Sequence, residues 1–326
     1  MVHMDTIRDR AGSQVVGRFA PTPSGRMHLG NVFSCLMAWL GARSAGGQMV
    51  LRIEDLDQRA QRPEHTEMLM HDLVWLGLDW DEGPFYQSRR SEIYCDALAE
   101  LERQELVYPC FCTRQQLHAA SAPHASDGTY VYQGTCRGLS AAEVARRSLE
   151  RKPAMRLRVP EADDPHASVS FEDLVYGQHE ENLAIDCGDF LVRRSDGVFA
   201  YQLAVVVDDA LMGINQVVRG RDLLGSVARQ TYLLGLLGKE IPAYAHVPLV
   251  VAPDGRRLSK RNRDLDLGAL REAGVRPERI VGRLAQAIGL AEIGEDLRPQ
   301  DLVERFSWKA LRDRQNDIVV DSNFLL

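Results

Sequence analysis

The sequence predicts an α/β fold built on an open parallel sheet, and three observations lead to this expectation. A short apolar strand over residues 14–19 enters a loop with two prolines and a glycine, and a helical pattern over residues 29–45 follows. A second apolar strand over residues 49–53 completes a strand–loop–helix–strand start. Another strand–helix unit lies over residues 217–237, as a doubly wound sheet requires.

The length and composition are those of an ordinary globular enzyme. The chain has 326 residues, of which 45% are hydrophobic and 26% charged, so that it can bury a large core without disulfides. The sequence shows neither a signal peptide nor an apolar run long enough to span a membrane. We therefore expect a cytoplasmic protein with no membrane partner. The net charge of −7 argues against a dedicated non-specific nucleic-acid binder but leaves room for a local basic groove.

The remaining elements follow from the same periodicities. Their expected ranges are helices over 63–76 and 91–105, short strands over 152–159 and 168–173, strands and a helix over 190–209, an apolar strand over 247–252, and helical segments towards the C-terminus. The intervening stretch is rich in Cys, Ser, Gly and Tyr, which favours an insertion with its own fold. We therefore expect a catalytic domain in two halves (14–100 and 188–265), an insertion (101–187) and a short helical C-terminal region (266–326).

Residues 18–31 form the first motif that carries chemistry, RFAPTPSGRMHLGN. A strand ends in a Pro/Gly loop that opens a helix, and the free N–H groups of a helix N-terminus suit a phosphate. His28 can donate to a phosphate oxygen, and Gly30 allows a nucleotide to approach the backbone. Taken alone, His-x-Gly is more often explained by a capping or core histidine.

Residues 254–262 form the second motif, DGRRLSKRN, directly after the predicted strand over 247–252. Its four cations and Ser259 can fold over a triphosphate and neutralise the charge that develops as pyrophosphate leaves. Taken alone, such a segment is more often a solvated basic loop.

Together the two motifs resemble the paired nucleotide motifs of class I aminoacyl-tRNA synthetases. The flanking segments, LRIEDLD at 51–57, YQLAVVVDD at 201–209 and VRGRDLL at 218–224, resemble glutamyl-tRNA synthetase catalytic domains, and the resemblance spans residues 14–265. It implies a Rossmann-like catalytic domain. The sequence departs from the family at Asn31 and around the Ser259–Lys260 pair, which itself is kept, so that catalysis is still expected.

The 66 residues after Lys260 are fewer than an anticodon-reading region needs, and on this ground the chain resembles the shortened glutamyl-Q tRNA(Asp) synthetase family. The resemblance implies activation of L-glutamate by ATP without tRNA, and transfer of glutamate to the queuosine base at the wobble position of tRNA(Asp). Nothing in the sequence suggests an obligate protein partner, and we expect none. Two alternatives stay open: a truncated glutamyl-tRNA synthetase that charges a 3′ end, and a non-catalytic paralogue that binds tRNA or protein. The intact motifs argue against the paralogue.

The resemblance also assigns the site residues. Arg18 and Arg219 would meet the substrate carboxylates, Glu54 the α-ammonium group, and Tyr201 the side-chain carboxylate. The backbone of the first-motif loop would lie against glutamate. These glutamate-loop residues are Phe19, Ala20, Pro21 and Thr22, and the ATP-binding residues are His28, Gly30, Asn31, Ser259 and Lys260, with Mg²⁺ accompanying ATP.

Two of these residues could instead form structural ion pairs with no role in substrate binding. Glu54 could pair with Arg52, and Arg219 with Asp222, as ordinary structural ion pairs. Catalysis is expected to rest on His28 and Lys260, which would stabilise the phosphates.

A cysteine cluster lies in the expected insertion. Cys110 and Cys112 are followed by Cys136, and spacing alone favours three reduced cysteines over a zinc site. His118 and His124 are rival fourth ligands to a tyrosine. The family resemblance implies a structural Zn²⁺ held by Cys110, Cys112, Tyr132 and Cys136. Two further cysteines, Cys35 and Cys95, are expected in the core.

Overall fold

One parallel and one mixed sheet form the centre of the molecule in the computed structural model, which describes residues 14–57, 61–119, 131–258, 266–321 and 324–325. The first contains β1 (Val16–Phe19), β2 (Gln48–Ile53) and β3 (Glu82–Tyr86) in that order, all parallel. The second has the order β7-β6-β10-β9. Its strands are β6 (Ser168–Asp173), β7 (Gly177–Asn182), β9 (Gln216–Gly220) and β10 (Ala243–Val247), and only β6 and β7 pair antiparallel.

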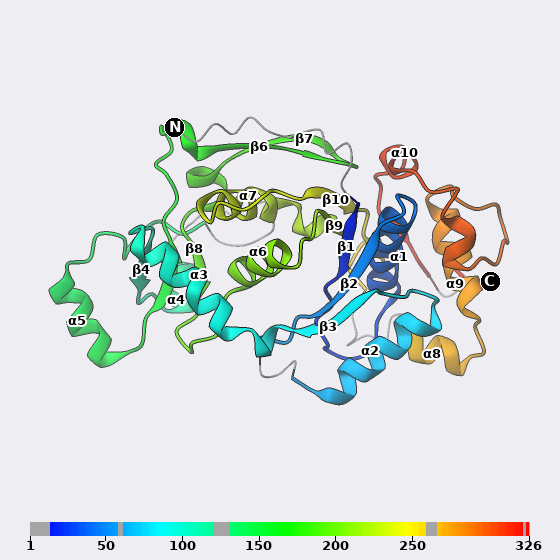
Figure 1. Ribbon diagram of the computed structural model, residues 1–326, viewed down its shortest axis with the longest axis horizontal. Helices are drawn as coiled ribbons and strands as arrows, with labels where there is room; N and C mark the ends of the chain where they lie inside the picture. Colours follow the sequence, from blue (N-terminus) through cyan, green and yellow to red (C-terminus); the bar gives the residue numbers. More distant parts are fainter. Residues whose placement is uncertain (1–13, 58–60, 120–130, 259–265, 322–323, 326) are drawn as a thin grey trace.

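The two sheets meet at β1 and β9 (Figure 1). The backbone N–H of Asn215 donates to the Val16 carbonyl at 3.1 Å, and the Val16 N–H donates to Asn215 Oδ1 at 2.8 Å. Two residues further on, Arg18 Nη1 donates to the Val218 carbonyl at 3.1 Å. The two strands therefore run side by side in the same direction, and their carboxyl ends meet at one edge of the layer.

Helices cover both faces of this layer. One face carries α1 (Leu29–Arg43), α2 (Pro63–Trp75), α8 (Leu267–Glu272) and α9 (Pro277–Ala287), and the other carries α3 (Ser91–Arg103), α6 (Tyr201–Leu211) and α7 (Val227–Leu236). Alternation along β2 sends Met49 and Leu51 into the first core and Val50 into the second. The same period aims Arg52 towards α6, where it meets two carboxylates.

A third, antiparallel sheet lies at one end of the molecule (Figure 1). It has the order β4-β5-β8 and consists of β4 (Val107–Cys110), β5 (Ala154–Leu157) and β8 (Phe190–Arg193), with α4 (Arg114–Ala119) and α5 (Ala141–Glu150) beside it. The segment 101–187 supplies strands both to this sheet and, through β6 and β7, to the central layer.

The C-terminal region lies at the opposite end (Figure 1). After α9 it contains α10 (Trp308–Arg312) and β12 (Ile318–Val319), which pairs in parallel with β11 (Val250–Val251). None of the helices in the described ranges is long and apolar enough to cross a bilayer.

Two sequence-based expectations are wrong. The apolar run over 247–252 is not one strand, because β10 ends at Val247 and Pro248, which has no N–H, separates it from β11. Cys95 is exposed, whereas Cys35 is buried as expected. The helix over 29–45 and the strand over 168–173 are found with the same or nearly the same bounds.

Candidate active site

A cavity of about 640 Å³ opens at the carboxyl ends of β1 and β9. In open α/β sheets ligands bind at such a point, where the strand order reverses. Its walls include every expected glutamate- and ATP-binding residue that the structure describes: Arg18, Phe19, Ala20, Pro21, Thr22, His28, Gly30, Asn31, Glu54, Tyr201 and Arg219. Ser259 and Lys260 lie outside the described residues, although Arg257 and Leu258, which precede them, line the cavity.

His28 is the N-cap residue of α1, directly before the first helical residue, Leu29. Its Nδ1 accepts from the Gly30 N–H at 3.2 Å, and its own N–H donates to Asn31 Oδ1 at 3.3 Å. A Cβ at Gly30 would lie 3.1 Å from the His28 ring, so glycine keeps the ring in place. Because Nδ1 accepts, a neutral ring carries its proton on Nε2, the nitrogen that would meet a phosphate oxygen.

A buried ion network supports the wall formed by β1 and β2. Arg52 Nη1 donates to Asp209 Oδ1 at 2.6 Å, and its Nη2 donates to Glu54 Oε1 at 3.3 Å. Arg18 Nε lies 3.5 Å from the same Asp209 oxygen. Burial raises the pKa of Glu54, and the charges of Arg52 and Arg18 oppose that rise. The Glu54–Arg52 pair that the sequence offered as the simpler reading does form, yet Glu54 also reaches the cavity.

Arg219 on β9 has its partners behind and beside the cavity. Its Nε donates to His246 Nε2 at 3.0 Å, Nη1 donates to the Tyr201 hydroxyl at 3.2 Å, and Nη2 donates to the Leu223 carbonyl at 3.1 Å. The alternative partner Asp222 instead accepts from Arg257 Nη1 at 2.9 Å. Arg219 and Tyr201 therefore form one polar corner of the cavity.

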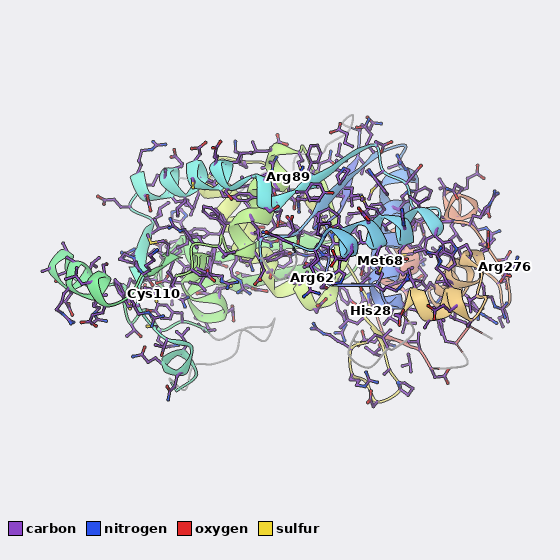
Figure 2. All side chains as sticks on the ribbon, turned by 90° about the horizontal axis from the view of Figure 1, so that it is seen from below. His28, Arg62, Met68, Arg89, Cys110 and Arg276 are labelled. Carbon is purple, nitrogen blue, oxygen red and sulfur yellow. The ribbon has the colours of Figure 1, made fainter. Side chains whose placement is uncertain are left out.

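The cysteine cluster comes together as a compact set of metal donors, far from His28 along the molecule (Figure 2). The sulfurs of Cys110, Cys112 and Cys136 all lie within 4.8 Å of one another. The Tyr132 hydroxyl lies 3.6 Å from the sulfurs of both Cys110 and Cys112, and the sulfurs of Cys112 and Cys136 are 3.6 Å apart. A tetrahedral Zn²⁺ with Zn–S bonds of about 2.3 Å has S···S and S···O edges of roughly 3.5–3.8 Å. These four donors fit such an ion, and the three cysteines could hold a metal.

A cation faces the cluster from β5. The Arg156 guanidinium lies 3.8 Å from the centroid of the Tyr132 ring, and its Nε donates to Cys110 Sγ at 3.4 Å. Burial opposes ionisation of Cys110, yet the Cys112 N–H, the Tyr132 hydroxyl and Arg156 together lower the pKa of its thiol. At Cys110 the surroundings thus favour the thiolate, which is the form that binds a metal. Burial instead raises the pKa of the Cys112 thiol to about 11.

Gly188 joins the cluster to the chain that enters β8. It has φ +63°, and a Cβ there would lie 2.8 Å from the Tyr132 N and 2.9 Å from its O. The backbones of Tyr132 and Gly188 form a parallel bridge. Only glycine satisfies both the left-handed backbone and the close approach.

A second cavity of about 720 Å³ adjoins the first and has cluster residues in its wall. Tyr132 and Arg156 line one end of it, and Tyr201, Asp222 and Arg257 line both cavities. A molecule bound near the insertion can therefore extend to the wall formed by Tyr201.

Sequence reasoning missed the residues that hold these groups. It assigned no role to Asp209 and did not single out His246 or Asp173. Asp209 stands within a matched segment and could have been found by placing Arg52 on the face of β2 that packs against α6. His246 lies in an apolar strand 73 residues from its partner Asp173, and no local pattern joins the two.

The chain belongs to the family of catalytic domains of class I tRNA synthetases (E and Q), whose family model matches residues 14–320. A relative from Symbiobacterium thermophilum, named glutamyl-Q tRNA(Asp) synthetase, is 48% identical over 302 residues, which cover 89% of this chain and 91% of the relative. The expected family is confirmed.

Two further relatives show the wider family. A glutamate–tRNA ligase from Halorhodospira halophila is 40% identical over 328 residues, covering 94% of this chain and 68% of the relative. The crystal structure of a glutamate–tRNA synthetase from Elizabethkingia anophelis matches with a TM-score of 0.80 at 25% identity, over 96% of this chain and 69% of that one. The expected α/β class is therefore confirmed as well.

Proposed function

We propose that this chain activates L-glutamate with ATP, without tRNA, and then transfers the glutamate to the queuosine base at the wobble position of tRNA(Asp). One observation carries the proposal: a single cavity gathers the guanidinium groups of Arg18 and Arg219, the Glu54 carboxylate and the Tyr201 hydroxyl. These groups complement a molecule with two carboxylates and one ammonium group. The 48% identity to a glutamyl-Q tRNA(Asp) synthetase supports the choice of acceptor.

Glutamate binding would use groups that the protein has already oriented. Arg219 donates three hydrogen bonds to described protein groups, and a guanidinium has five N–H donors, so two are left for a carboxylate. Because the Tyr201 hydroxyl accepts from Arg219, its own proton can be donated to the same carboxylate. Glu54 would accept from the ammonium group, which favours its ionised form.

The activation step needs no protein nucleophile. An oxygen of the α-carboxylate attacks the α-phosphorus of ATP in line, the bond to the bridging oxygen breaks, and pyrophosphate leaves. His28 Nε2–H and the positive end of α1 would meet the phosphates, together with Lys260 and Ser259 of the second motif. Mg²⁺ bound to ATP would neutralise further phosphate charge.

The insertion would serve the acceptor. Zn²⁺ held by Cys110, Cys112, Tyr132 and Cys136 would have four protein ligands and no open position, so its role is structural. Such an ion would fix the wall of the second cavity, through which an acceptor hydroxyl would reach the adenylate. Attack of that hydroxyl on the glutamyl carbonyl forms an ester and releases AMP.

A conventional glutamyl-tRNA synthetase activity is the second candidate, because a glutamate–tRNA ligase is also a relative, at 40% identity. The two candidates share the activation step and differ in the acceptor. The identities favour the glutamyl-Q activity.

ATP–pyrophosphate exchange tests the activation step. The wild-type chain should exchange in a glutamate-dependent way with no tRNA present. Lys260→Ala should lower the exchange rate by about 10²–10³-fold, because one preorganised donor to the developing charge is lost. Lys239→Ala, an exposed lysine after α7, is the matched control and should exchange like wild type. Exchange that ignores glutamate, or a Lys260→Ala variant as active as the control, contradicts the proposal.

A further inference from the structure

A chain of three buried polar side chains lies directly behind the active-site cavity. His246 on β10 is 0% exposed, Asp173 at the end of β6 is 1% exposed, and Arg219 is 6% exposed. His246 Nδ1 lies 2.6 Å from Asp173 Oδ2, and His246 Nε2 accepts from Arg219 Nε at 3.0 Å. Among the three, only Arg219 lines the cavity.

The hydrogen bonds around Asp173 fix where the protons are. Asp173 Oδ1 accepts from the backbone N–H groups of Val175 and Tyr176, at 3.0 and 2.9 Å. Its Oδ2 accepts from the backbone N–H of His246 at 3.0 Å. A carboxylate surrounded by donors is held ionised, and its burial is outweighed by His246 and these N–H groups, which lower the pKa of Asp173. It can therefore only accept, and His246 Nδ1 must carry the proton that is donated to it.

The proton on Nδ1 decides whether His246 Nε2 is a hydrogen-bond acceptor or a donor towards Arg219. Burial, aided by the Arg219 charge, lowers the pKa of His246 to about 4 against the opposing hydrogen bond to Asp173, so the ring is neutral near pH 7. A neutral ring protonated at Nδ1 has a lone pair on Nε2, and this lone pair accepts from Arg219 Nε. The other tautomer would place two N–H donors against each other in a buried site.

We propose that Asp173 and His246 are positioning residues that hold the Arg219 guanidinium in the direction in which it binds the substrate. This inference rests on the proposed function, in which Arg219 meets a carboxylate of glutamate. The remaining contacts of Arg219 do not involve Nε: the Tyr244 ring lies 5.5 Å from the guanidinium carbon, and the Tyr201 hydroxyl and the Leu223 carbonyl each accept from one terminal nitrogen. Without the His246 acceptor, Arg219 would have to turn to satisfy its buried Nε–H.

Asp173→Asn tests the proton assignment with almost no change in shape. Its amide oxygen would face the Val175 and Tyr176 N–H groups, so the NH₂ group would point at His246 Nδ1 and force the proton to Nε2, against Arg219. The His246 backbone N–H, which lies 3.0 Å from Oδ2 and 3.2 Å from Oδ1, would then donate to the amide oxygen in the Oδ1 position. We expect KM for glutamate in tRNA-independent ATP–pyrophosphate exchange to rise about tenfold to a hundredfold, with KM for ATP unchanged.

Two substitutions of His246 give a second test, should Asp173→Asn fold poorly. His246→Gln keeps an oxygen that can accept from Arg219 and should retain a lower KM for glutamate than His246→Leu, which has no acceptor. His179→Gln is the matched control, since His179 stacks on Phe171 in the same β6–β7 hairpin and lies outside the cavity. It should leave both KM values at the wild-type level.

The ¹⁵N spectrum of wild-type protein labelled at histidine supplies a readout that does not depend on activity. We expect His246, assigned by its loss in His246→Gln, to show a protonated Nδ1 and an unprotonated Nε2. A protonated Nε2, or a folded Asp173→Asn variant whose KM for glutamate matches that of His179→Gln, overturns the inference. If wild type shows no glutamate-dependent exchange, the proposed function fails, and the spectrum still decides the tautomer.

Discussion

Asp209 is the residue whose substitution tests the buried ion network most sharply. In the described part of this network three cations, Arg18, Arg52 and Arg90, are balanced by three carboxylates, Glu54, Asp208 and Asp209. Asp209→Asn keeps the shape and removes one negative charge. The three cations then face only two carboxylates, so the network carries one excess positive charge around Arg52, which is 0% exposed.

Distances set the size of the expected loss. Breaking a buried pair costs about 3–5 kcal/mol because a charge stays buried without its partner. Arg52 keeps Glu54 at 3.3 Å and Asp208 at 3.8 Å, so we expect the lower end of the range, about 3 kcal/mol. Arg18 would lose the carboxylate 3.5 Å from its Nε, and KM for glutamate should rise as well.

Urea unfolding followed by tryptophan fluorescence measures the change in unfolding free energy. Asp57→Asn is the matched control, because Asp57 pairs with Arg194 at 3.3 Å in a partly exposed position and its loss should cost at most about 1 kcal/mol. The reasoning is refuted if Asp209→Asn lowers the unfolding free energy no more than Asp57→Asn does.

Three further predictions concern the metal cluster, a glycine and acid stability. Zinc analysis of the purified protein should find about one ion per chain, and Cys112→Ser should lower both this content and the Tm; full metal content in Cys112→Ser would exclude the assigned ligands. Gly188→Ala should lower the unfolding free energy by more than about 1–2 kcal/mol, because alanine is strained at φ +63° and its Cβ would also clash with the Tyr132 backbone. Gly197→Ala is the control: the space around Gly197 is open and its φ is +91°, so this variant should show the backbone strain alone. Because His246 has a folded pKa of about 4 and an ordinary value of 6.5, the unfolded state binds more protons between these pH values, and stability should fall as the pH drops from 6.5 to 4. The slope of Tm against pH over this interval should be smaller in His246→Gln, and an equal slope would contradict the assignment.

The sequence predicts most of the central layer and the walls of the cavity, because both depend on local patterns. The period of two along residues 49–53 and the Pro/Gly loop before His28 are signals that a short stretch carries on its own. The same pattern does not reveal the break at Pro248, because the apolar run continues on both sides of the proline.

Contacts between distant segments could not be predicted in the same way. His246 and Asp173 are 73 residues apart, and their pairing depends on β6 lying beside β10, which neither segment encodes alone. The metal donors are an intermediate case. The spacing of the cysteines identifies them as candidate ligands, but the bridge between Tyr132 and Gly188, which helps to place the tyrosine beside them, joins segments that are distant in the sequence.

The acceptor assay tests the central claim most directly. Purified protein, ATP and radiolabelled glutamate are incubated with tRNA(Asp) that contains queuosine, with tRNA(Asp) that lacks it, and with tRNA(Glu). We expect label only on the queuosine-containing tRNA(Asp), and we expect it to persist when the 3′-terminal adenosine has been removed. Label on the 3′ end of tRNA(Glu) would contradict the account and assign the chain a conventional glutamate–tRNA ligase activity.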